Sequence, residues 1–187
     1  MYEPGSILNL ILKSIFVGFG IVIPILALVK TSSLRAIEVK QLFILTAVQT
    51  VRVAGIPYII LFLVQTYFLY NTRPLSIWPD AAEAMLFGPY WLTWFSPLMY
   101  FLLSQLLWVK KLYIKRYALV TMSLFLLILP SRRFLMFIQV WYRDYLPSSW
   151  AMYTINPFIE VLLNIIVFTF VIFTIMLANG KFKKIKR

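Results

Sequence analysis

The chain has 187 residues, of which 62% are hydrophobic, 18% aromatic and only 13% charged, and its formal net charge is +12. A soluble domain of this length needs far more polar surface, so the composition excludes an ordinary soluble protein and predicts an integral membrane protein. Cysteine and histidine are both absent. Their absence excludes thiolate ligation of iron–sulfur clusters, ordinary haem or zinc ligation, disulfides and an imidazole base, so we expect no cofactor and no metal bound by this chain.

Long apolar runs predict an all-α membrane bundle that forms one domain over residues 1–187. Each run has about 20 to 30 residues, enough to cross a hydrocarbon core of about 30 Å. The runs are continuous rather than alternating, which is typical of helices and not of a barrel. The first run has no basic segment before it and no small-residue cleavage site, so we interpret it as a retained helix. The five predicted spans are 7–29, 41–70, 89–109, 117–141 and 157–178.

Basic residues predict how these spans are oriented. Most of them fall in alternate polar segments, whereas the other side has only Arg73, Arg132, Arg133 and Arg143. The positive-inside rule then places the N-terminus outside and the C-terminus inside, on the side of the cytoplasm or its equivalent. The same charges favour contact with anionic lipid. Because orientation and lipid contact account for the positive net charge, we expect no nucleic-acid binding. The basic segments contain Lys30, Arg35 and Lys40, then Lys110, Lys111, Lys115 and Arg116, then Lys181, Lys183, Lys184, Lys186 and Arg187.

Charged residues at membrane depth are costly and are functional candidates for that reason. Arg52 is predicted near the midplane of the second span, just before Gly55 and Pro57, which should kink the helix. A hydrogen bond to carbonyls of the kink is the favoured interpretation, and an ion pair with a partner subunit is the alternative. Arg132 and Arg133, in the fourth span, either snorkel outward or face a partner.

The last span begins with typical helix-start residues. Asn156 suits the N-cap and Pro157 the first turn, and the carboxylate of Glu160 is favourable near the positive end of the helix dipole. We interpret Glu160 first as a helix-start residue and second as a proton-handling carboxylate. In the first span, Lys13 is expected to snorkel, and the glycines of FVGFG, Gly18 and Gly20, are expected to allow close helix packing.

Four sequence segments together resemble a known family. They are GPYW at 88–91, SQLLWVKK at 104–111, RRF at 132–134 and RDYLPSSWAMY at 143–153. Their order is similar to the C-terminal half of the NrfD/PsrC-like membrane subunits, above all those of alternative complex III, a quinol:electron-acceptor oxidoreductase. The resemblance implies a truncated or split subunit in the inner membrane, whose partners are NrfD-like, iron–sulfur and cytochrome c subunits. Quinol, haem and iron–sulfur clusters would then be bound in those partners.

The same alignment of motifs shows where the chain departs from the family. Tyr142 stands where the family has histidine, and Arg132 where it has glutamate, whereas Arg143, Asp144 and Trp150 are kept. The chain thus lacks protonatable groups that the family has, whereas it keeps the turn at LPSSW. The resemblance therefore implies a structural role, with the following candidates for a quinol cavity or subunit interface: Arg133, Tyr142, Arg143, Asp144 and Trp150.

Three functions follow as hypotheses. The leading one is a structural, non-catalytic subunit of a quinol-oxidising respiratory complex. The second is half of a quinol- and proton-handling unit completed by another chain, in which Asp144 relays a proton and Arg143 sets its charge state. The third is a small transporter or channel subunit with Arg52 as the substrate contact.

Overall fold

The structure, a computed structural model, describes residues 4–30, 32–72, 92–131, 134 and 157–180. Within these ranges every regular element is an α-helix, so the predicted all-α fold is confirmed for this part of the chain. The helices are α1 (Pro4–Leu28), α2 (Leu34–Thr72), α4 (Leu92–Leu106), α5 (Lys110–Ile114), α6 (Arg116–Ile128) and α8 (Pro157–Ala178).

Three described helical stretches are long and apolar enough to cross a membrane. They are Ile7–Leu28, Leu34–Phe68 and Phe158–Ala178. A helix suits a hydrocarbon environment because it satisfies its backbone hydrogen bonds internally. The predicted spans 89–109 and 117–141 include residues outside the described ranges, and the helices described there, α4 and α6, are 15 and 13 residues long. The described part thus has the helices of a membrane-embedded protein, and the total of five spans stays a prediction.

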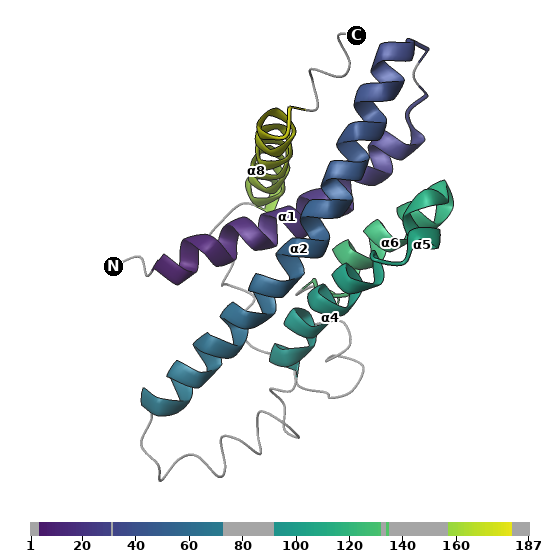
Figure 1. The fold of residues 1–187 in the computed structure, drawn as a ribbon. Helices are drawn as coiled ribbons and strands as arrows, with labels where there is room; N and C mark the ends of the chain where they lie inside the picture. Colours follow the sequence, from purple (N-terminus) through teal and green to yellow (C-terminus); the bar gives the residue numbers. More distant parts are fainter. Residues whose placement is uncertain (1–3, 31, 73–91, 132–133, 135–156, 181–187) are drawn as a thin grey trace.

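Helix α1 holds the bundle together, because it contacts α8, α6 and α2. In Figure 1, α8 lies on one side of α1 and α2, and α4, α5 and α6 lie on the other. Helix α2 in turn contacts α4 and α8. It continues through Pro57 as one helix of 39 residues, so the expected kink at Gly55 and Pro57 does not interrupt it.

Residue pairs between helices show the direction in which each helix runs. Lys13 is near Glu160, and Gly18 is packed on Phe168, so α1 and α8 are parallel. Tyr58 contacts Tyr100 and Phe62 contacts Trp94, so α2 and α4 are antiparallel. Gly20 meets Leu127, whereas the end of α1 meets Arg116, so α1 and α6 are antiparallel as well.

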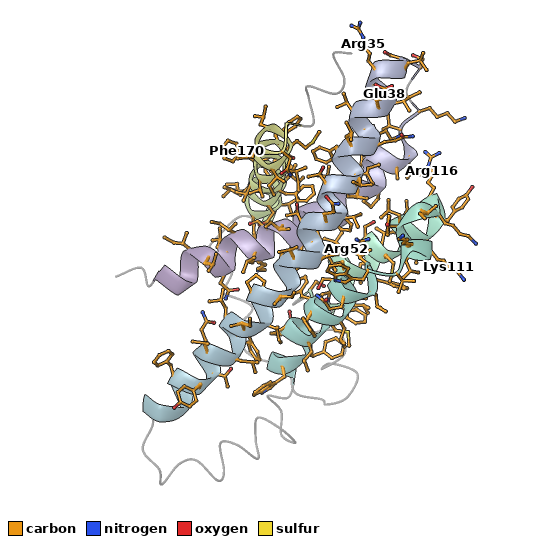
Figure 2. All side chains as sticks on the ribbon, in the orientation of Figure 1. Arg35, Glu38, Arg52, Lys111, Arg116 and Phe170 are labelled. Atoms are coloured by element: carbon orange, nitrogen blue, oxygen red, sulfur yellow. The ribbon has the colours of Figure 1, made fainter. Side chains whose placement is uncertain are left out.

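This arrangement brings together basic residues that are far apart in the sequence. Lys30, Lys40 and Arg116 line one cavity at one end of the bundle, which we call the basic end. Figure 2 shows Arg35, Arg116 and Lys111 on this end as well. Residues of the first two predicted basic segments therefore lie together at one end of the described bundle, and the orientation in a membrane stays a prediction. The third basic segment, 181–187, lies outside the described residues.

The core consists of aromatic rings and closely approaching helices. Phe16 of α1 stacks on Tyr100 of α4 at 4.7 Å between centroids and meets Tyr58 of α2 edge-on at 5.3 Å. Lipid tails are as apolar as these side chains, so dispersion contacts and tight packing, more than the hydrophobic effect, hold such helices together. Phe16, Phe19 and Phe168 are fully buried.

The two glycines of FVGFG serve different helix pairs. A Cβ at Gly18 would collide with Phe168 of α8, and a Cβ at Gly20 would lie 2.6 Å from the Cβ of Leu127 on α6. Residues two apart on a helix point about 200° apart, so each glycine faces a different neighbour. The expectation that these glycines allow close packing is confirmed.

Candidate functional site

The first candidate site surrounds Arg52 on α2, opposite the end of α4. Here α2 and α4 approach closely, because Gly55 has no side chain and a Cβ there would collide with Ser104. The Gln105 amide donates from Nε2 to the Arg52 carbonyl oxygen at 3.3 Å. Trp108 donates from Nε1 to Gln105 Oε1 at 3.0 Å. These bonds fix the backbone of Arg52 against the end of α4.

The guanidinium of Arg52 lies against two aromatic rings. Its Cζ is 4.5 Å from the ring centroid of Tyr113 and 5.4 Å from that of Trp108. Such cation–π contacts are worth about 0.5 to 2 kcal/mol, depending on how far the cation is desolvated. We call Arg52, Gln105, Trp108 and Tyr113 the Arg52 cluster, and Figure 2 labels Arg52 on α2.

Part of this guanidinium is buried without an acceptor. Nε and Nη2 are inaccessible to solvent and find no hydrogen-bond partner among the described residues. For these two nitrogens the arrangement differs from the predicted hydrogen bond to kink carbonyls. A buried donor without a partner costs about 1 to 3 kcal/mol, more when it is charged. The Arg52 cluster is therefore a place where the described bundle is electrostatically incomplete.

Arg52 lies near the middle of the apolar helical stretch Leu34–Phe68. It is level with Gln105 and Trp108, and Lys110 and Lys111 follow Trp108 closely along the chain. Its position near the midplane of a membrane stays a prediction. A cation at that depth is costly to bury, which makes Arg52 a functional candidate.

The second candidate site is the contact between α1 and α8, which we call the α1–α8 seam: Lys13, Ser14 and Gly18 with Glu160, Asn164 and Phe168. Lys13 Nζ is 3.5 Å from Glu160 Oε1, in an ion pair whose side chains are about half exposed. One turn deeper, the buried Ser14 hydroxyl lies 2.7 Å from Asn164 Oδ1. The same hydroxyl is 2.8 Å from the Leu10 carbonyl oxygen, so it always has an acceptor.

Glu160 is in the first turn of α8, where a carboxylate is favourable, and it also pairs with Lys13. The contact with Lys13 is an addition to the helix-start role expected for Glu160. It also gives Lys13 a partner in addition to the snorkelling that was predicted. The carboxylate of Glu160 thus stabilises the start of α8 and also joins α8 to α1.

The remaining predicted site residues lie outside the described ranges: Arg132, Arg133, Tyr142, Arg143, Asp144 and Trp150. Within the described ranges, no group of three or more His, Cys, Asp or Glu side chains is placed to hold a metal ion. Arg52 and Glu160 thus belong to two separate polar contacts. Arg52 lies between α2 and the α4–α5 segment, and Glu160 lies between α8 and α1.

Several residues of these contacts were not singled out from the sequence. Ser14 and Asn164 are 150 residues apart, and neither belongs to a recognisable motif. The available signal was their polarity within strongly apolar helices, because an amide or hydroxyl in a membrane span usually bonds to a neighbouring helix. Trp108 belongs to the segment SQLLWVKK, where no role was assigned to it. Tyr113 resembles an ordinary interface aromatic until the fold places Arg52 against it.

Comparison of the chain with protein-family models, with curated proteins and with solved structures gives no match.

Proposed function

We propose that this chain is a structural membrane subunit of a quinol-oxidising respiratory complex of the alternative complex III type, located in the inner membrane. The observation that supports a structural role is the use of interior polar side chains for joining helices. Ser14 bonds across to Asn164, Gln105 to the Arg52 carbonyl, and Ser96 donates to the Pro130 carbonyl at 2.9 Å. The resemblance of RDYLPSSW and its companion segments supports the type of complex.

In this proposal the chain packs against a fuller NrfD-like subunit, while haem and iron–sulfur subunits bind at the outer face. Helix α8 is suited to such packing, because it is held on the α1 side and exposes large apolar side chains elsewhere. Phe158 and Phe170 are each 72% exposed, and Figure 2 shows Phe170 on the outer side of α8. The unpartnered nitrogens of Arg52 would find an acidic group in the complete assembly.

The test is purification of the tagged protein from its native membrane in mild detergent. Mass spectrometry would identify the associated subunits, and a reduced-minus-oxidised spectrum would detect haem. Co-purification of haem, iron–sulfur and NrfD-like subunits is the expected result. A chain that purifies alone and colourless would overturn the respiratory assignment.

Deletion of the chain then distinguishes a structural from a catalytic role. Without it, we expect the complex to lose assembly, measured as the yield of the intact particle on native gels. Normal yield with lost quinol oxidation would instead favour a chain that contributes half of a quinol site. The control is a strain in which a plasmid restores the wild-type chain.

A further inference from the structure

The basic end contains a cavity that the proposed function does not use. It is a depression open to solvent, with a volume of about 350 Å³, between the residues that follow α1, the first turns of α2 and the start of α6. Three of its lining residues are cations, and the others carry no charge. The lining consists of Val29, Lys30, Ile37, Lys40, Gln41 and Arg116.

The cations that line the cavity are not equally available. Lys40 donates from Nζ to the Val29 carbonyl oxygen at 2.6 Å and so satisfies a backbone acceptor just beyond the end of α1. Lys30 and Arg116 are exposed, and neither forms an ion pair within the described part of the chain. The nearest acidic residue along α2, Glu38, is not part of the lining. The cavity therefore presents a net positive charge with two accessible cations.

The start of α6 adds to this positive potential. Arg116 is the first residue of α6, and its N-cap, Lys115, forms no side-chain cap hydrogen bond. The first amide groups of a helix carry a partial positive charge and can bind anionic oxygens. Arg116 itself offers several donors in a planar fork that matches a phosphate.

Exposed apolar side chains occur beside the cations of the cavity, which indicates the kind of anion that fits. The apolar stretch Ile7–Leu28 ends one residue before Val29, so the cavity lies where a membrane surface would be. Val29 is 49% exposed, and Tyr117, next to Arg116, is 86% exposed. A free anion gains nothing from contact with such apolar surfaces, whereas the acyl chains and glycerol of a lipid can pack on them.

We propose that this cavity binds the phosphate headgroup of an anionic membrane lipid, with Lys30 and Arg116 as its charged ligands and Gln41 as a neutral donor. This site depends on the membrane location of the chain and not on the identity of any complex. Its failure would thus leave the proposed function untouched.

The experiment compares two double variants of the full chain, purified in detergent together with whatever subunits accompany it. Lys30→Gln with Arg116→Gln removes both accessible cations of the cavity. Lys110→Gln with Lys111→Gln removes the same charge from the neighbouring α5, which contributes nothing to the lining. Native mass spectrometry would measure the binding of phosphatidylglycerol and of phosphatidylcholine to each protein.

The wild type is expected to bind phosphatidylglycerol in preference to phosphatidylcholine. The cavity variant should bind phosphatidylglycerol at least about tenfold more weakly, since each basic residue near an anionic surface contributes roughly fivefold. The α5 variant should keep the preference. Exchange of the two cations for each other, Lys30→Arg with Arg116→Lys, should restore most of the affinity.

Three outcomes would overturn the proposal. Equal loss in both double variants would indicate general surface charge and no defined site. Equal binding of both lipids by the wild type would indicate no headgroup selection. If inorganic phosphate displaced phosphatidylglycerol at comparable concentration, the cavity would be a site for a free anion and not for a lipid.

Discussion

The α1–α8 seam and the Arg52 cluster differ in whether their polar groups find partners within the chain. Both place polar groups inside an apolar bundle, where a group without a partner is destabilising. In the seam, Ser14 meets Asn164 and Lys13 meets Glu160, so the polar groups are matched within the chain. In the cluster, aromatic rings cover the guanidinium, but two of its nitrogens have no acceptor among the described residues. The polar groups of the seam are thus satisfied within the chain, whereas the Arg52 cluster is the place where the proposed association with a partner can be tested.

The largest effect is expected at the close approach in the seam. Gly18→Leu should destabilise the bundle by about 3 kcal/mol, because backbone and Cβ atoms of α8 occupy the space and cannot move aside as a flexible side chain would. Asn164 O would lie only 2.9 Å from the new Cβ. Chemical or thermal unfolding in detergent, followed by circular dichroism, measures this loss. The control is Gly180→Ala, where no atom lies within 4 Å of the new Cβ and only the backbone conformation is affected.

Arg52→Met tests whether the cluster is incomplete within the isolated chain. Removal of two unpartnered buried donors should outweigh the lost cation–π contacts, so we expect the isolated chain to become more stable by about 1 kcal/mol. In the native membrane the same variant should lower the yield of the assembled complex. Arg52→Lys, which keeps the charge and loses planar stacking, is the matched comparison. A strong loss of stability on Arg52→Met would mean that the guanidinium is satisfied inside the chain.

Asn164→Leu should have a moderate effect on the seam. The variant removes the bond to Ser14, but the Ser14 hydroxyl can still donate to the Leu10 carbonyl oxygen. The loss should therefore be limited to about 1 kcal/mol, as for other interhelical hydrogen bonds in membranes. A double-mutant cycle with Ser14→Ala isolates the coupling between the two side chains. Additive losses would show that the two groups act independently.

The smallest effect is expected for Lys13→Met. The ion pair with Glu160 is long, at 3.5 Å, and both side chains are about half exposed. Solvent-exposed pairs contribute only a few tenths of a kcal/mol and are weakened by salt. Unfolding at low and high ionic strength should thus give nearly the same result for wild type and variant. A loss comparable to that of Asn164→Leu would show that the pair is shielded by lipid.

The sequence was sufficient for features that depend on local composition. Apolar runs such as 157–178 predicted α8, which the structure gives as Pro157–Ala178, because a long hydrophobic stretch can bury itself only as a helix. Helix-start residues placed Glu160 in the first turn of α8. The glycines Gly18 and Gly20 were also interpreted correctly as sites of close packing, although not with their partners.

Tertiary structure decided everything that depends on which helix faces which. Ser14 and Asn164 meet only because α1 and α8 are parallel, and Tyr113 reaches Arg52 only because α4 ends beside the middle of α2. The basic residues Lys30 and Arg116 form one cavity for the same reason. Composition and periodicity determine that a segment is a helix, because backbone hydrogen bonding and solvation are local. Contacts between helices depend on the fit of whole surfaces, and no short stretch of sequence specifies that fit.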